Sequence, residues 1–188
     1  MRDDEQGINW PNIPNKNLES AFWCHGATGI GQFFLHASKV KIVNDSYELA
    51  LRAALTVSST LAIGPTFCHG LAGNIEFLLD VYQTSHDINW LFLAFRLAHM
   101  LNAFAITQHG HHFFSSESPK IFTPDYMVGY AGLIPCFLRL SQPDNLPSIL
   151  NFAAIKKWII NNSPYAQSIA QEVLRDRSSD KLDCRALR

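Results

Sequence analysis

The feature that most constrains the fold is a G-x-x-G motif that occurs three times, each time directly before an apolar stretch with helical spacing. The three copies read CHGATGIGQFFLHA, CHGLAGNIEFLLDV and MVGYAGLIPCFLRL. Their leading glycines are Gly26, Gly70 and Gly129, so the copies start 44 residues apart (26 to 70) and then 59 residues apart (70 to 129). Such a period holds a pair of helices with their turns, which is typical of solenoids and closed toroids of helix pairs.

The apolar positions that follow each motif agree in register. Counted from the second glycine, positions +1, +4, +5 and +8 hold Ile30, Phe33, Phe34 and Ala37 in the first copy, Asn74, Phe77, Leu78 and Val81 in the second, and Leu133, Cys136, Phe137 and Leu140 in the third. All but Asn74 are apolar, and this spacing places them on one side of a helix. Each unit is therefore predicted to be a glycine turn, a helix with one buried face and, usually, a second helix.

Strand signals are poor, and the chain is predicted to be nearly all helix. The expected helices lie at about 29–40, 45–62, 71–83, 87–108, 130–141 and 153–176. Loops are expected over 1–20 and 110–128, and Pro164 is expected to break or restart the last helix. Residues 90–106 are apolar almost all round, which predicts a helix covered on more than one side.

The composition favours a globular chain and disfavours several classes of partner. The chain has 188 residues, 47% of them hydrophobic, and a formal net charge of −1, so a nucleic-acid partner has no electrostatic support. The most apolar stretches contain Arg52, Arg96 and His99, which are costly in lipid, so we expect no membrane span. The N-terminus MRDDEQGINWPN does not resemble a signal peptide, and four cysteines do not suggest a disulfide scaffold. We therefore expect a cytoplasmic protein.

Two of the three motifs begin with Cys-His. They are Cys24-His25 and Cys68-His69, whereas the third copy has Met127-Val128 at the same positions. Equivalent turns of a helical array lie at one end of it, so we expect Cys24 and Cys68 to face each other. Thiolates and imidazoles together suit zinc, and three protein ligands plus one open position is the catalytic pattern. From spacing alone the alternative stays open that these are buried thiols and imidazoles beside structural glycines.

These residues resemble the lanthionine synthetase C-like family, the cyclases of lanthipeptide biosynthesis and their eukaryotic relatives. The resemblance rests on WCHGATGIG, CHGLAGN and GYAGLIPCFLRL and covers about residues 8–152. The stretch LSQPDNLPSIL is also similar to the end of the cyclase domain in bifunctional class II lanthionine synthetases. The resemblance implies an α/α toroid, of which this chain corresponds to about the last three of seven helix-pair repeats.

The resemblance also implies a zinc site and a reaction. Cys24, Cys68 and His69 match the zinc ligands of the family, and the fourth position would take the thiol of a cysteine in a precursor peptide. The thiolate would add to a dehydrated serine or threonine of the same peptide, which forms a thioether ring. The implied activity is that of a lanthionine synthetase, a cyclase that forms carbon–sulfur bonds.

The chain departs from the family pattern in what it lacks. Members also use a histidine and an aspartate from earlier repeats, and bifunctional members carry a dehydratase half. The chain is therefore expected to be either an active cyclase fragment or a non-catalytic zinc-binding remnant or split subunit, which needs an N-terminal cyclase or dehydratase partner. Glutathione binding, as in eukaryotic relatives, is a third hypothesis. His25 is a candidate catalytic proton donor, with a hydrogen bond to the metal site or a substrate contact as the alternative.

We expect three segments: a polar N-terminal segment 1–20, the cyclase domain 21–152, and a C-terminal helical extension and tail 153–188. The histidines His109, His111 and His112 are expected in a solvated loop. Cys136 is expected to be a core thiol, and Cys184 a free one.

Three further side chains lie next to the motifs. Trp23 precedes the first Cys-His pair, where it would either wall the site or pack in the core. Asp125 and Tyr126 precede the third turn, where they would contact a peptide.

Overall fold

The computed structural model describes residues 2–4, 7–11, 21–60, 64–118, 120–164 and 167–168, and the chain divides into two units, Met1–Asn145 and Leu146–Arg188. The first unit holds α1 (Ala27–Val40), α2 (Ser46–Ser59), α3 (Leu71–Ser85), α4 (Ile88–Asn102), the short 3-10 turn η1 (Tyr130–Gly132) and α5 (Leu133–Ser141). The second unit holds α6 (Phe152–Asn162), which ends just before Pro164. The predicted all-α fold class is confirmed.

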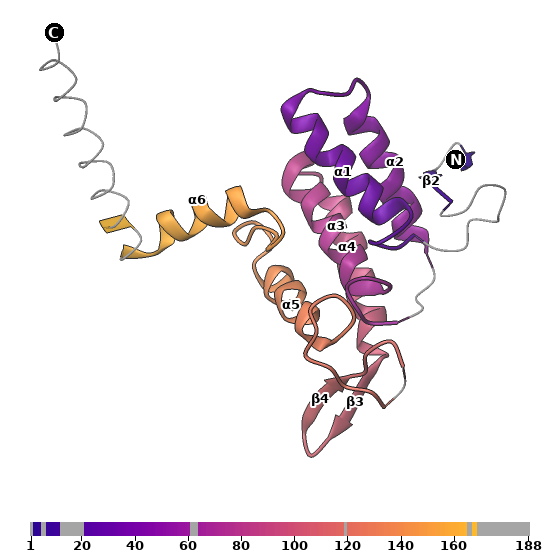
Figure 1. Ribbon diagram of the computed structural model, residues 1–188, viewed down its shortest axis with the longest axis vertical. Coiled ribbons are helices and arrows are strands. Elements are labelled where there is room, and N and C mark those ends of the chain that lie inside the picture. Colours follow the sequence, from indigo (N-terminus) through magenta and orange to yellow (C-terminus); the bar gives the residue numbers. More distant parts are fainter. Residues whose placement is uncertain are drawn as a thin grey trace, which may run out of the picture. The chain divides into compact units, whose positions relative to one another are not determined.

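The helices of the first unit pack as pairs (Figure 1). α1 lies against α2, and α3 lies against α4, so each pair is one repeat of the sequence motif. The first helices of successive repeats are also neighbours, because α3 packs against both α1 and α5. The repeat of turn, helix and second helix is therefore present as predicted, and the closed toroid stays a prediction.

The buried face of α1 agrees with the prediction only in part. Ala37 is buried and Phe34 packs against the core, as expected, but Phe33 is 61% exposed, and Gly31 and Leu35 are buried instead. A Cβ atom on Gly31 would overlap with the side chains of Phe77 and Ala53 from the neighbouring helices. α1 thus packs against its neighbours through the side that contains Gly31, because the absence of a side chain there permits close helix packing. The largest apolar residues do not determine this side.

Burial agrees with the prediction in α5 and differs from it in α4. In α5 the expected positions Leu133, Cys136 and Leu140 are buried. Residues 90–106 were expected to form a helix covered on more than one side. α4 contacts α3 and α2, but it exposes Phe92 and Phe95 to solvent, so it is less covered than predicted. The helix buried on all sides is α3, from Leu71 to Tyr82, because it contacts α1, α2, α4 and α5.

Two short hairpins replace segments predicted as loop or helix. β1 (Arg2–Asp4) and β2 (Gly7–Asn9) pair antiparallel within the expected loop 1–20, and Ile8 packs on α2 with 1% exposure. β3 (Ala105–Gln108) and β4 (His111–Phe114) pair antiparallel where a helix to 108 and then a loop were expected. The turn between them is His109-Gly110, both at positive φ, as in the type I′ turn that is common in two-residue hairpins.

The second glycine of each motif permits a close backbone contact. A Cβ atom there would overlap with the carbonyl oxygen of the aromatic residue six positions earlier, in the pairs Gly29 and Trp23, Gly73 and Phe67, and Gly132 and Tyr126. Each turn therefore folds back onto the start of its own helix. Only glycine leaves room for this approach.

The three turns lie side by side. The ring centroids of Trp23 and Phe67 are 5.7 Å apart, and those of Phe67 and Tyr126 are 5.2 Å apart. The backbone N–H of Trp23 donates to the carbonyl of Cys68 (3.2 Å), and the N–H of Cys68 donates to that of Met127 (2.7 Å). This aromatic ladder of Trp23, Phe67 and Tyr126 places equivalent turns at one end of the array, as the repeat predicts.

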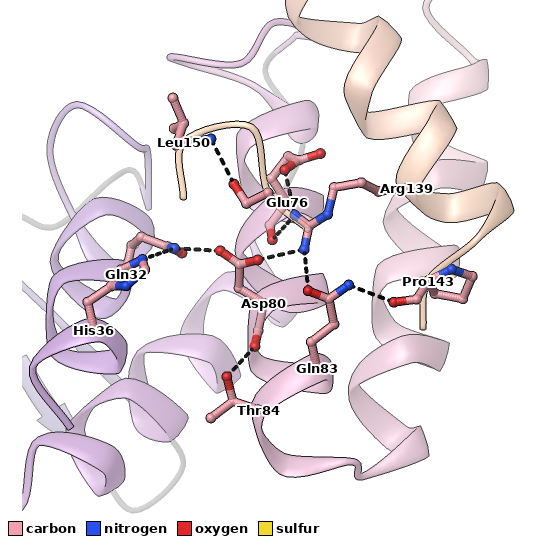
Figure 2. A network of polar contacts seen from close by, with 10 residues as sticks. Gln32, His36, Glu76, Asp80, Gln83, Thr84, Arg139, Pro143 and Leu150 are labelled. Atoms are coloured by element: carbon pink, nitrogen blue, oxygen red, sulfur yellow. Dashed lines mark hydrogen bonds and ion pairs between the residues drawn. The ribbon is translucent and has the colours of Figure 1, made fainter. Parts of the chain in front are cut away.

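A buried ion-pair cluster joins the first helices of all three repeats (Figure 2). Arg139 of α5 is 2% exposed and reaches α3, where it donates to Glu76 Oε2 (2.6 Å), Asp80 Oδ1 (2.6 Å) and Gln83 Oε1 (3.0 Å). Gln32 of α1 donates to the other oxygen of Asp80 at 2.5 Å. Burial opposes the charge of Arg139, but the two carboxylates outweigh it and raise its pKa. Burial raises the pKa of Glu76 and the charge of Asp80 adds to the effect, although Arg139 opposes both.

We expect Gly73→Ala to destabilise the protein by about 1–3 kcal/mol, because the new methyl group would push Phe67 out of the ladder. Gly64→Ala is the matched control, since nothing lies within 4 Å of the added Cβ atom. Urea denaturation followed by circular dichroism measures both. Equal stability of the two variants would show that the close contact is dispensable.

We expect Arg139→Met to lower the free energy of unfolding by about 3–5 kcal/mol, because Glu76 and Asp80 would remain buried without their cation. Adding Glu76→Gln and Asp80→Asn should recover part of this loss. Lys39→Met, at an exposed position of α1, is the control and should change stability by less than about 0.5 kcal/mol. A loss below about 1 kcal/mol for Arg139→Met would contradict the role of the cluster.

Candidate metal centre

The two Cys-His turns bring their side chains together. One sulfur and one nitrogen of each imidazole, from Cys24, His25 and His69, all lie within 4.8 Å of one another. Cys24 Sγ is 2.9 Å from His25 Nδ1, and Cys68 Sγ is 3.8 Å from His69 Nε2. The structure thus groups Cys24 and His69 with His25, and it places Cys68 beside both Cys24 and His69. This is a group that can hold a metal ion.

The two thiols differ in their environment. Cys24 is exposed, whereas Cys68 is buried. Burial raises the pKa of Cys68 to about 12, and hydrogen bonding to Cys24 and the charge of Glu117 add to the effect. Cys68 is therefore a neutral thiol at neutral pH unless a cation beside it offsets the loss of hydration.

Glu117 fixes one of the imidazoles. Its Oε1 atom pairs with Nδ1 of His69, on the side of the ring away from the atom that faces Cys68. A carboxylate on the far nitrogen of a metal-binding histidine sets the tautomer and the ring orientation. Glu117 lies 48 residues from His69 along the chain, and no local pattern in the sequence points to it.

Phe22 supports both imidazoles from one side. Its ring meets those of His25 and His69 edge-on, with centroid distances of 5.8 and 5.6 Å. The two imidazoles are themselves 5.8 Å apart. Phe22 therefore positions both rings through apolar packing.

The types of donor fit zinc, although Cys68 is not in the group of three donors that lie within 4.8 Å of one another. Two sulfurs and two imidazole nitrogens are ligands that zinc binds in tetrahedral sites. Zinc–sulfur bonds of about 2.3 Å and zinc–nitrogen bonds of about 2.0–2.1 Å place a sulfur and a nitrogen ligand about 3.6 Å apart. The Cys68–His69 separation of 3.8 Å is close to that value, and the Cys24–His25 separation of 2.9 Å is shorter. The shorter distance is that of a hydrogen bond between the two side chains.

A cavity opens beside this group of donors. It has a volume of about 310 Å³ and includes Cys24, His25 and Ile30 in its wall, together with Trp10 and Trp23. Trp23 thus both walls the cavity and packs in the ladder, so its two predicted roles are compatible. The cavity gives a small molecule or a side chain a path to the exposed thiol of Cys24.

The model of the lanthionine synthetase C-like family matches residues 1–151 of the chain. The chain belongs to this family. A protein of Danio rerio named glutathione S-transferase LANCL1 is 34% identical over 74 residues, which are 38% of this chain and 18% of that protein. The chain therefore spans less than a fifth of this curated relative. Among the described helices of this family member, none is long and apolar enough to cross a membrane.

Other candidate residues of this lanthionine synthetase C-like protein lie away from the centre. The exposed residues His109, His111 and His112 belong to the β3–β4 hairpin and its turn, so the predicted exposure is confirmed and the predicted loop was wrong. Cys136 is fully buried, as predicted. Cys184 lies outside the described residues.

The two residues before the third turn have structural roles. Asp125 Oδ1 accepts the backbone N–H groups of Met127 and Val128, each at 2.7 Å, which holds the turn in shape. Tyr126 continues the aromatic ladder, and burial raises the pKa of its hydroxyl. Contact of either with a peptide stays a prediction.

We expect Glu117→Gln to weaken zinc binding by about 10- to 100-fold, because His69 loses the carboxylate that orients it. Competition with a chromophoric chelator measures the affinity. Glu48→Gln, at an exposed position of α2, removes the same charge elsewhere and should leave the affinity unchanged. Unchanged affinity in Glu117→Gln would show that the contact does not support a metal ligand.

Proposed function

We propose that the chain is a zinc-dependent, lanthionine cyclase-like domain that promotes addition of a thiol to a dehydrated amino acid. Cys24, Cys68 and His69 are the proposed zinc ligands. The observation that carries the proposal is the convergence of two Cys-His turns, from two repeats of a lanthionine synthetase C-like protein, on one group of sulfur and nitrogen donors. The same thiols need a reducing compartment, which supports a cytoplasmic location.

Different residues of the chain would have different roles at this site. Zinc, when bound, favours the thiolate form of a thiol that joins it and keeps that sulfur nucleophilic. His69 would be held in place by Glu117, and Cys68 by its burial and its backbone bonds. The cavity beside Cys24 would receive the substrate and its two indoles would limit the access of water.

The proposed reaction needs no oxidant or reductant. The thiol of a peptide cysteine loses its proton, and its sulfur forms a bond to Cβ of a dehydroalanine or dehydrobutyrine in the same peptide. The π electrons of the Cα–Cβ double bond move toward the carbonyl as an enolate. A proton then bonds to Cα, supplied by water or by His25, which lies beside Cys24. The product is a thioether ring, lanthionine or methyllanthionine, with the same atoms as the substrate.

A second candidate is the transfer of glutathione. The observation in its favour is the match to a relative named a glutathione S-transferase. The same ligands would hold the glutathione thiol, which would add to a dehydrated residue of a separate molecule. The two candidates share the attacking group and differ in whether the acceptor belongs to the same chain.

A non-catalytic role is the alternative to both. The family resemblance implies acid–base groups from earlier repeats, and this chain spans 18% of its curated relative. The protein would then bind zinc and act only together with a partner that supplies an N-terminal cyclase or dehydratase half. Activity of the purified chain alone would exclude this alternative.

We expect purified protein to contain about one zinc ion per chain, and Cys24→Ala and Cys68→Ala each to abolish binding, because each removes a thiolate ligand. Plasma emission spectroscopy measures the metal. Cys136→Ala removes a buried thiol elsewhere and should keep the zinc. Metal-free protein after expression with added zinc would contradict the proposal.

The same preparations test the reaction on a dehydrated precursor peptide. Ring formation leaves the peptide mass unchanged and removes one alkylatable thiol per ring. Glutathione transfer instead raises the mass by one glutathione per acceptor. A zinc-loaded chain that does neither would support the non-catalytic alternative.

A further inference from the structure

We propose that the free edge of β4 and the apolar cavity beside it form a docking site for an extended segment of the substrate peptide. The peptide would add to β4 as a third strand and place alternate apolar side chains in the cavity, which is a known mode of peptide recognition. The inference rests on the proposed function, because it takes the substrate to be a peptide. It adds a binding site that lies outside the group of metal donors.

β4 has one edge without a neighbouring strand. β3 and β4 form a two-stranded sheet in the part of the chain that the structure describes (Figure 1). Because a two-residue turn joins Gln108 to His111, these two form a hydrogen-bonded pair, and the next pair, Thr107 with His112, does not. By the same alternation the backbone N–H and C=O groups of His112 and Phe114 point away from β3. Outside the hairpin, no described residue forms a backbone hydrogen bond with these groups.

An apolar cavity follows this edge, and we name it the β4 cavity. Its volume of about 730 Å³ lies in the range of cavities that hold ligands, and Phe122, Tyr130 and residues of α5 close its other sides. The consecutive residues His112, Phe113 and Phe114 all line it. Successive side chains of a strand point to opposite faces, so the β4 cavity reaches both faces of the strand. These faces meet at the edge that β3 leaves free.

The wall of the β4 cavity selects for apolar side chains. Five of its lining residues are aromatic and three are aliphatic, and the other two are Gln108 and His112. Several of the apolar residues are exposed, among them Ile134 of α5 at 56%, so an occupant would remove apolar surface from water. An extended backbone along β4 would direct every second side chain to the same face. The occupant therefore needs large apolar residues at alternate positions.

The position of the β4 cavity beside the candidate centre points to the substrate peptide as the occupant. Glu117, which pairs with His69, follows the end of β4 by three residues, at most about 10 Å of chain. Tyr130 in the cavity wall belongs to the third glycine motif, and in the same motif the carbonyl of Met127 accepts the backbone N–H of Cys68. The continuation of a peptide that is docked on β4 would therefore reach the metal donors.

The first experiment measures docking on the full chain without metal. The probe is a fluorescein-labelled peptide of seven residues, in which phenylalanine or valine alternates with threonine and cysteine is absent. Fluorescence anisotropy should show saturable binding. Two further peptides carry N-methyl groups, one on the amides of its apolar residues and one on the amides of its threonines. One of the two should bind at least about tenfold more weakly, because only one set of amides faces β4. Equal affinity of all three peptides would overturn strand addition.

A pair of proline variants tests the strand edge. His112→Pro removes an N–H from the free edge of β4, and Thr107→Pro removes one from the opposite edge of the hairpin. Neither N–H pairs the two strands, so a proline is compatible with the hairpin at both positions. His112→Pro should weaken binding of the unmethylated peptide by about 3- to 10-fold, because a hydrogen bond is lost. Thr107→Pro, the matched control, should leave the affinity unchanged.

A pair of charge variants tests the β4 cavity. Ile134→Glu places a carboxylate in its wall and should weaken binding by at least about tenfold, because the apolar peptide would bury that charge. Leu138→Glu adds the same charge one turn later on α5, at a residue that is 54% exposed and does not line the cavity, and should bind as the wild type does. With a dehydrated precursor peptide and zinc-loaded protein, Ile134→Glu should raise KM and leave kcat unchanged.

The outcomes separate the docking site from the proposed function. Peptide binding that survives both His112→Pro and Ile134→Glu overturns the docking site, even where the chain forms thioether rings. Docking that these two variants weaken, in a chain that forms no ring, supports the docking site and contradicts the reaction. Dimerisation that His112→Pro abolishes, without peptide binding, assigns the edge to a second copy and overturns the inference. Should His112→Pro fail to fold, Ile134→Glu and Leu138→Glu decide.

Discussion

The contact on which the candidate site depends is the one between the second glycine of each motif and the carbonyl of an aromatic residue. Because the carbonyls of Trp23 and Phe67 lie against Gly29 and Gly73, each turn folds back onto its helix. The aromatic rings then pack against one another across the repeats, and in the first two repeats the residue that follows the ring is a cysteine, Cys24 or Cys68. A side chain at either glycine would push the turn outward and separate the two thiols. The glycines and aromatic residues of the motifs therefore set the spacing of the candidate metal donors, although they are not donors themselves.

α3 connects this end of the array with the buried charges. It begins directly after Cys68-His69-Gly70, and Glu76 follows six residues after that glycine, about 9 Å along the helix. There Arg139 from α5 binds α3, and one turn further Gln32 from α1 binds Asp80. The burial of three charges is costly, and such clusters are retained in some proteins because they specify one register. In this cluster α3 binds α1 and α5, the two helices whose turns lie on either side of its own turn. The aromatic ladder at the turns and the ion pairs further along the helices therefore hold the three helices in the same alignment.

The sequence predicted the features that depend on repetition and missed those that depend on tertiary neighbours. Equal spacing of Cys24 and Cys68 from their glycines was enough to predict that their turns meet. The predicted face of α1 was wrong at Phe33, because the helix makes its closest approach at Gly31, which a count of large apolar residues does not register. The β3–β4 hairpin was missed because β3 begins only three residues after the end of α4, and the residues that join them are apolar, so the sequence shows no boundary between helix and strand. Glu117 could not be found, since its contact with His69 spans 48 residues of chain.

The candidate centre has two donors that other contacts hold in place, Cys68 and His69, and two that are accessible, Cys24 and His25. Cys68 is buried and His69 is tied to Glu117, so neither side chain can leave without breaking other contacts. Cys24 is exposed, and His25 borders the cavity walled by Trp10 and Trp23. If the proposed function holds, an incoming thiol would reach the donors from the Cys24 side, past the two indoles. A peptide cysteine and glutathione would then both be suited to this route, because both present a thiol on a flexible side chain. What distinguishes them is the chain attached to that thiol, which the walls of the cavity, and not the metal donors, must accommodate.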